Sequence, residues 1–179
     1  MILASVYLSC TTEMKIMELH IKSRHHIRSN NAKKILKELE KVFDLSDIAA
    51  ALKGKRFELI KTRLYDIILV DGAPLIFILD GKPFLTVKGA LEIAPEQRTV
   101  VVDAGATKFV VNGADVMRPG IARADTTIAA GDLVIVVEEL HGKAIAIGRA
   151  IVPGDEMVGE SGKAVKSVHY VGDALWDVM

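Results

Sequence analysis

Two Asp-Gly pairs in the first half of the chain constrain its fold more than any other local pattern. Asp71-Gly72 and Asp80-Gly81 each stand between short runs of Val, Ile, Leu and Phe. Glycine adopts a positive φ without penalty, so an Asp-Gly pair between β-prone runs indicates a tight hairpin. Residues 57–83 are therefore predicted to form antiparallel strands joined by these turns.

Helical signals come before the hairpins. Between residues 35 and 43, apolar side chains recur at the spacing of one helical face, and Ser29 or Asn30 is placed to cap the amino end. Residues 15–22 alternate loosely, as a strand does, and residues 46–52 read as a second short helix ending near Gly54. Together with the hairpins, these elements predict a small α+β domain over the first half of the chain.

The second half is rich in β-prone runs. His141-Gly142 is predicted to join two of these runs as a hairpin, and a run near the carboxyl end supplies another strand. Short strands with glycine turns predict a small closed or nearly closed barrel. The linker candidate Pro95-Glu96-Gln97 predicts two domains, 1–94 and 95–179. Residues 104–112 favour a strand by propensity, although Asp103 could cap a helix there and Gly113 could end it.

Composition excludes several classes of protein. Half of the residues are hydrophobic, which excludes a disordered tail protein, and the single Cys excludes a disulfide framework and a Cys-rich zinc site. The net charge is zero, yet residues 1–98 carry 16 basic and 12 acidic side chains, whereas residues 99–179 carry 7 and 11. Residues 15–63 alone carry 13 basic and 6 acidic side chains, a balance typical either of a nucleic-acid contact or of a solvated helix face.

Signals for targeting and catalysis are missing from the sequence. Residues 2–10 form an apolar run that no Lys or Arg precedes and that is shorter than the roughly 20 residues of a membrane helix, which predicts a cytoplasmic protein. Met14 and Met17 are alternative starts to Met1. The common hydrolase, P-loop and zinc-protease motifs are absent, and His25 and His26 would face opposite sides of a strand. We therefore expect no catalytic residue, no metal and no cofactor.

One stretch carries a family resemblance. Residues 101–137, VVDAGATKFVVNGADVMRPGIARADTTIAAGDLVIVV, resemble the PUA domain, an RNA-binding module named after pseudouridine synthases and archaeosine transglycosylases. The resemblance continues through residues 146–148 and the closing run HYVGDALW, residues 169–176. With a smaller domain ahead of it, the chain is similar to the malignant-T-cell-amplified family, also called the translation-machinery-associated family. The resemblance implies a pre-PUA domain followed by a PUA barrel in which residues 104–112 form a short helix.

The resemblance also implies where RNA would bind. In PUA domains the groove is formed by this short helix, the loop after it and a neighbouring strand. Arg118 is the leading candidate, because a guanidinium pairs with phosphate through two hydrogen bonds. Gly113 and Gly120 are expected to adopt positive φ and to let an RNA backbone approach. The complete candidate set is Lys108, Gly113, Ala114, Arg118, Pro119, Gly120, Arg123, Arg149 and Lys163.

The basic segment adds a second candidate surface. Its lysines on one side of the expected helix are Lys33, Lys34, Lys37 and Lys41. They suit ribosomal RNA or an acidic protein face. Few aromatic residues are available for base stacking, so recognition of a structured RNA such as tRNA or rRNA by shape is expected.

The resemblance implies a translation factor that works with tRNA and the small ribosomal subunit in initiation, reinitiation or recycling. Family members in eukaryotes work with a density-regulated protein partner. Two other classes stay open: an accessory RNA-modification protein, and a PUA-fold protein-interaction module that does not bind RNA. The acidic balance of residues 99–179 favours the last of these.

Overall fold

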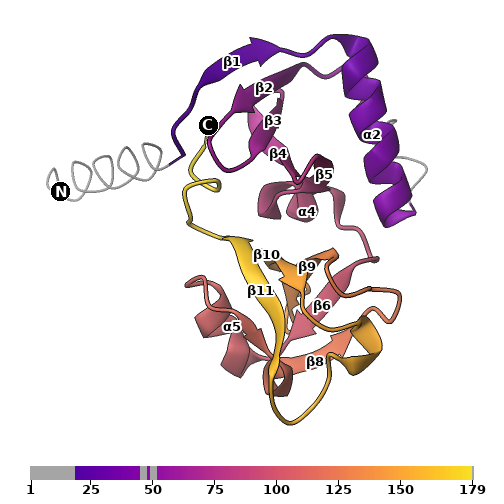
Figure 1. Ribbon diagram of the computed structural model, residues 1–179, viewed down its shortest axis with the longest axis vertical. Coiled ribbons are helices and arrows are strands. Elements are labelled where there is room, and N and C mark those ends of the chain that lie inside the picture. Colours follow the sequence, from indigo (N-terminus) through magenta and orange to yellow (C-terminus); the bar gives the residue numbers. More distant parts are fainter. Residues whose placement is uncertain (1–18, 45–47, 49–51, 179) are drawn as a thin grey trace, which may run out of the picture.

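The structure is a computed structural model, which describes residues 19–44, 48 and 52–178. Two sheets lie one above the other in Figure 1. The first has five strands that are antiparallel and follow chain order. They are β1 (Ser23–His26), β2 (Phe57–Lys61), β3 (Asp66–Val70), β4 (Ala73–Leu79) and β5 (Lys82–Leu85).

Both predicted Asp-Gly hairpins are confirmed. Asp71-Gly72 joins β3 to β4 and Asp80-Gly81 joins β4 to β5. All four residues have positive φ, between 50° and 89°, as a two-residue turn of this hand requires. The mixed α+β character of this half is confirmed as well.

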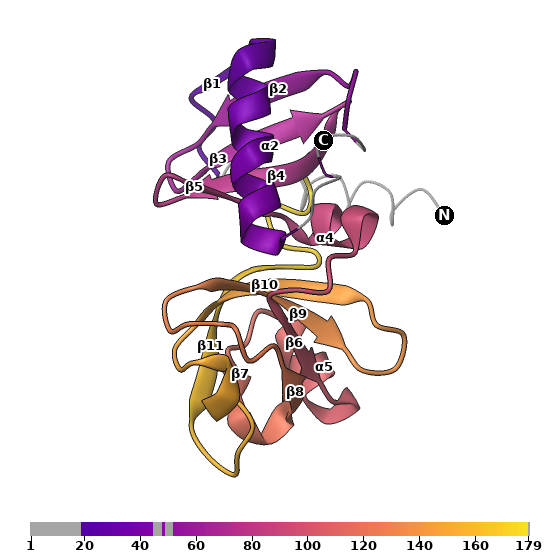
Figure 2. The ribbon, with the colours of Figure 1, turned by 90° about the vertical axis from the view of Figure 1, so that its right-hand side faces the viewer.

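The helix α2 (Ser29–Phe43) covers this sheet (Figure 2) and buries Ala32, Leu36, Leu39 and Phe43. Neither Ser29 nor Asn30 caps it, so that prediction is wrong. Because the helix already begins at Ser29, the capping position falls on Arg28, whose side chain makes no capping hydrogen bond.

The predicted first strand is displaced along the chain. Residues 15–18 lie outside the described residues, and residues 19–22 are not in a strand. Pairing with β2 places β1 later, with Ser23 opposite Lys61, and all four of its side chains are exposed, so no apolar alternation marked it. The predicted helix over 46–52 lies mostly outside the described residues. Gly54, near which it was predicted to end, has a φ of +80°.

The second sheet is the predicted, nearly closed barrel. Its strand order is β7-β11-β10-β9-β6-β8, and only β6 and β9 pair in parallel. The edge strands β7 and β8 are joined by the short 3-10 helix η1 (Arg118–Gly120), which brings the two edges together. The strands are β6 (Thr99–Val102), β7 (Val116–Met117), β8 (Ile121–Ala124), β9 (Leu133–Glu138), β10 (Ala144–Ala150) and β11 (Lys163–Tyr170). A second 3-10 turn is η2 (Gly154–Glu156), and the predicted β9–β10 hairpin through His141-Gly142 is confirmed.

Residues 104–110 form the helix α5 (Ala104–Val110), so the strand that propensity favoured is wrong and the helix that the resemblance implied is confirmed. The Asp103 carboxylate accepts a hydrogen bond from the Ala106 backbone N–H at 2.7 Å and caps the helix. Val110 is buried in the barrel core. This cap and the burial of one face outweigh the β propensity of the segment.

The two halves share an apolar junction. The core of the first half contains Phe43, Phe77 and Phe84, and it continues into Ile135 and Ile147 on the outer face of the barrel. The helix α4 (Val87–Ile93) lies at this junction (Figure 2). The sequence-based division at residues 94 and 95 stays a prediction.

The chain end returns to the first half. Leu175 and Val178 are buried in the first core, and the segment that follows β11 lies beside the upper sheet in Figure 1. Asp173 stabilises the turns of this segment. Its carboxylate lies 2.8 Å from His169 Nδ1 and accepts hydrogen bonds from the backbone N–H groups of Tyr170 and Trp176. The closing run HYVGDALW therefore connects the barrel to the core of the first half.

None of the described helices has the length and the hydrophobicity that a membrane span needs.

Candidate nucleic-acid interface

A groove of about 510 Å³ lies where α5 meets β7 and η1, at the end of the barrel far from α2. Four of the predicted RNA-binding residues line it: Lys108, Ala114, Pro119 and Gly120. Residues from the helix, the loop after it and the short strand therefore come together as the resemblance implied. The remaining predicted residues lie around or away from this groove.

The two predicted glycines act differently. Gly113 has a φ of +85°, as predicted, and a Cβ there would lie 2.6 Å from the Tyr170 ring. Gly120 does not have a positive φ, so that part of the prediction is wrong. A Cβ on Gly120 would lie 2.5 Å from the Ala106 Cβ, so its role is to let η1 approach α5 closely. This close approach sets the shape of the groove.

Two large apolar side chains that the sequence did not single out are exposed in the groove. Phe109 is 59% exposed and Met117 is 48% exposed, and both line the groove. The Lys108 Nζ lies 5.2 Å from the centre of the Phe109 ring. With Val110 inward, a helix or a strand would each turn the adjacent Phe109 away from the core, but the sequence does not show which of the two side chains faces inward.

Arg118 lies beside the groove and does not line it. Its guanidinium packs against Gly159, where a Cβ would lie 2.6 Å from Nη2, and it donates a hydrogen bond to the Val158 carbonyl at 3.4 Å. Its Nε is buried and has no hydrogen-bond partner among the described residues. One side of Arg118 therefore supports the loop before β11, while the residue remains partly exposed.

Two of the predicted cations are already paired. The Lys163 Nζ lies 2.6 Å from the Asp115 carboxylate. Arg149 lies 2.6 Å from Asp80 of the β4–β5 turn and also donates to the Gly131 carbonyl at 3.1 Å, so it links the two halves. Arg123 lines a different pocket, next to α4. The structure therefore does not bring Arg123 and Arg149 to the groove.

Asp115 is held in its ionised form. The hydrogen bond from Lys163 and a second from the Ser167 backbone N–H, at 2.7 Å, lower the pKa of the Asp115 carboxyl below its ordinary value. A lowered folded-state pKa stabilises the fold above the ordinary value of about 3.9, and this contribution is lost as the pH falls through the folded pKa.

The free energy of unfolding of the Asp115→Asn variant is therefore expected to depend less on pH in the acid range than that of the parent protein. The free energy of unfolding of Asp115→Asn should lie below that of the parent near neutral pH, and the difference should close as the pH falls from about 4 through the lowered pKa of the carboxyl. Urea denaturation at a series of pH values measures this. A constant difference across the whole series would contradict the assigned role of the ionised carboxylate.

The second basic surface is separate from the groove. Lys33, Lys34, Lys37 and Lys41 are all exposed on α2, opposite its buried residues. In Figure 1, α2 lies in the upper part of the molecule and α5 in the lower part. Among the described residues, no three His, Cys, Asp or Glu side chains come together as a metal site would require.

Comparison with known proteins agrees with this geometry. The family model described as "PUA domain" matches residues 98–171. A protein of Methanocaldococcus jannaschii is 44% identical over 89% of this chain and 98% of its own length. A hypothetical protein of Pyrococcus horikoshii has a crystal structure that matches with a TM-score of 0.78 and 34% identity, covering 87% of this chain and 99% of that one.

A yeast relative carries an informative name. Translation machinery-associated protein 20 of Saccharomyces cerevisiae is 30% identical over 80% of this chain and 83% of its own length. The match thus spans both the helix-and-hairpin half and the barrel. The chain belongs to the family of PUA-domain proteins that includes translation machinery-associated protein 20.

Proposed function

We propose that this protein is a non-catalytic RNA-binding factor that acts in translation, with tRNA and the small ribosomal subunit, during initiation, reinitiation or recycling. Membership of the PUA family supports RNA binding, and the name of the yeast relative supports a role with the translation machinery. Such a factor would work in the cytoplasm, as the sequence predicts.

The observation that carries the proposal is the open groove with Phe109, Met117 and Lys108 at its surface. An unpaired base can pack against the exposed face of an aromatic ring, and the adjacent ammonium group can meet a phosphate. Ala114, Pro119 and Gly120 line the groove and would contact the RNA, with Gly113 and Arg118 at its margin. Arg149 and Lys163 would first have to leave their ion pairs, so they rank lower as contacts.

The lysines of α2 supply a second contact in this proposal. Lys33, Lys34, Lys37 and Lys41 suit the phosphates of ribosomal RNA or an acidic protein face, including a density-regulated type of partner. Because these lysines lie far from the groove, the barrel could bind a tRNA while the half that carries α2 binds the ribosome.

RNA affinity is expected to depend steeply on salt. If the groove neutralises about three phosphates, the affinity for tRNA should fall roughly 20- to 40-fold between about 50 and 200 mM salt, because condensed counterions are released on binding. The Arg118→Glu variant should bind more weakly and reduce the slope by about one. Filter binding to total tRNA and to small ribosomal subunits across a salt series measures both effects.

A matched control is Lys61→Glu, because Lys61 is exposed on β2 and lies outside both proposed surfaces. This variant should bind tRNA as the parent does. The same titration, together with an assay of base turnover on the bound RNA, separates the alternatives. Absence of binding to tRNA and subunits at low salt would favour a protein-interaction module, and turnover of an RNA base would favour an RNA-modification protein.

A further inference from the structure

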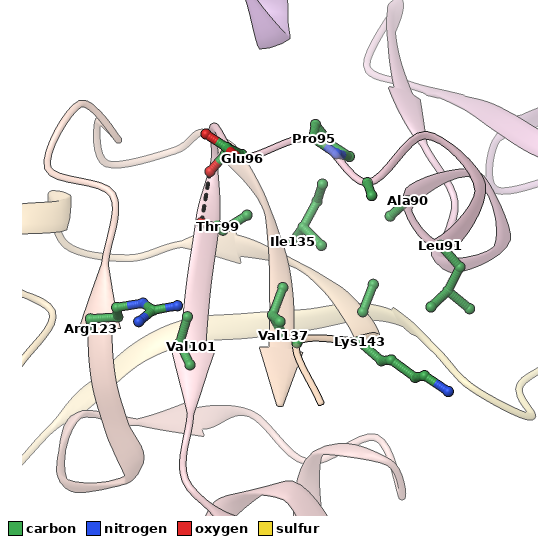
Figure 3. A pocket seen from close by; sticks show the side chains of 13 residues that line it. Ala90, Leu91, Pro95, Glu96, Thr99, Val101, Arg123, Ile135, Val137 and Lys143 are labelled. Atoms are coloured by element: carbon green, nitrogen blue, oxygen red, sulfur yellow. Dashed lines mark hydrogen bonds between the residues drawn. The ribbon is translucent and has the colours of Figure 1, made fainter. Parts of the chain in front are cut away.

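A second pocket, of about 560 Å³, lies between α4 and the outer face of the barrel (Figure 3). It is on a different side of the barrel from the α5 groove and shares no lining residue with it. Helix α4 and the linker contribute Leu91, Pro95 and Glu96, and the barrel contributes strand residues. The pocket therefore touches both halves of the molecule.

The barrel side of the pocket is a single row of side chains. Arg123 on β8 pairs with Val101 on β6, Val101 pairs with Val137 on β9, and Val137 pairs with Ala144 on β10. Residues that pair directly across strands project from the same face of a sheet. Figure 3 shows Val101 and Val137 between Arg123 at one end and Lys143 at the other. The row is therefore apolar in its middle and cationic at both ends.

The two cations of this row are available to a ligand. Arg123 and Lys143 are exposed, and neither forms an ion pair within the described part of the chain. The other cations of the barrel differ, since Arg149 and Lys163 are paired with carboxylates. Glu96 is the one carboxylate among the residues that line the pocket. The residues that line the pocket therefore carry a net positive charge, with two cations against one carboxylate.

The walls favour a peptide over a nucleic acid. The apolar lining is aliphatic, from Leu91, Pro95, Val101 and Val137, and no aromatic residue lines the pocket on which a base could stack. Leu91 is 40% exposed at the rim, which leaves apolar surface for a partner to cover. A pocket with an aliphatic lining and a cation at each end fits a peptide segment that is apolar in the middle and acidic at its ends.

We propose that this pocket is a docking groove for an extended acidic-apolar peptide segment of a partner protein. Four neighbouring strands are spaced about 4.8 Å apart, so the row from β8 to β10 spans about 14 Å. An extended chain rises about 3.4 Å per residue, so two carboxylates roughly four residues apart would reach both cations. The apolar side chain midway between them, which an extended chain projects to the same side as the carboxylates, would lie on Val101 and Val137. This proposal does not depend on RNA binding at the α5 groove.

The test uses the full chain with methyl groups labelled for NMR. The probe is a capped synthetic peptide with the core Glu-Leu-Val-Leu-Glu, and the matched control peptide has Lys in place of both Glu. The Glu peptide is expected to shift the methyl signals of Leu91, Val101 and Val137 with a dissociation constant of about 1 mM. The Lys peptide should leave them in place.

Variants locate the contact. Combining Arg123→Glu with Lys143→Glu should weaken peptide binding at least about tenfold, because both carboxylates then meet like charges. Combining Arg123→Gln with Lys143→Gln should give a smaller loss, and Lys61→Glu should give none. Methyl shifts that are absent at about 10 mM peptide, or unchanged in the double variant, would overturn the proposal. So would shifts of the same methyl groups by a single-stranded RNA oligonucleotide in place of the peptide.

Discussion

The Gly89→Ala variant is expected to lose roughly 3 kcal/mol of unfolding free energy, near the upper end for overpacking of a core. Helix propensity alone predicts the opposite sign, because alanine is favoured over glycine inside a helix by about 1 kcal/mol. The steric effect should win. A Cβ at Gly89 would lie 2.0 Å from the backbone oxygen of Leu75 on β4, and a backbone atom cannot turn aside as a flexible side chain can.

Hydrogen bonds prevent α4 from moving away to relieve this clash. The Thr86 backbone N–H donates to the same Leu75 oxygen at 3.0 Å, and the Thr86 hydroxyl donates to the Pro74 carbonyl at 2.6 Å. The hydroxyl oxygen also accepts from the Gly89 N–H at 3.0 Å. Displacing the helix would break these bonds within a buried region, where unpaired polar groups are costly.

Thermal and urea unfolding measure the loss, which corresponds to a fall in Tm of roughly 6–12 °C for a chain of this size. Glu92→Ala on the same helix is the control. Its exposed ion pair with Lys55 should contribute little, so that variant should remain within about 0.5 kcal/mol of the parent. A Gly89→Ala protein as stable as the parent would contradict the close contact between α4 and β4.

Truncating Phe109 to alanine is expected to weaken tRNA binding roughly 5- to 150-fold, because stacking of a base on an aromatic ring contributes about 1–3 kcal/mol. The fold should be unaffected, since the ring is 59% exposed. Binding by shape and phosphate contact alone predicts a much smaller effect. The variant therefore measures how far the groove recognises bases in addition to the RNA backbone.

Leu140→Ala is the matched control for Phe109→Ala. Leu140 is 80% exposed in the β9–β10 turn and does not line the groove. Its truncation removes a similar exposed apolar side chain, so tRNA affinity should stay unchanged. Equal affinity of the Phe109→Ala variant and the parent would exclude this ring as a contact and return the assignment to Lys108 and Arg118.

Local chemistry made part of the fold predictable. The turns at Asp71-Gly72 and Asp80-Gly81 depend on the positive φ of the residues themselves, so they could be read directly. The helix α2 shows its buried face by spacing alone. The β1 strand could not be found in this way, because its side chains are exposed and only pairing with β2 places it.

The candidate site was predictable only in part, for a similar reason. The sequence by itself indicated which segment carries the groove, through the family resemblance of residues 101–137, although propensity alone favoured a strand over residues 104–112. The tertiary structure decided which of the candidate cations remain available to bind RNA. Asp115 and Asp80, distant in sequence, neutralise Lys163 and Arg149, while cross-strand pairing sets Arg123 beside α4. Charge neutralisation depends on distances between strands, which sequence spacing does not specify.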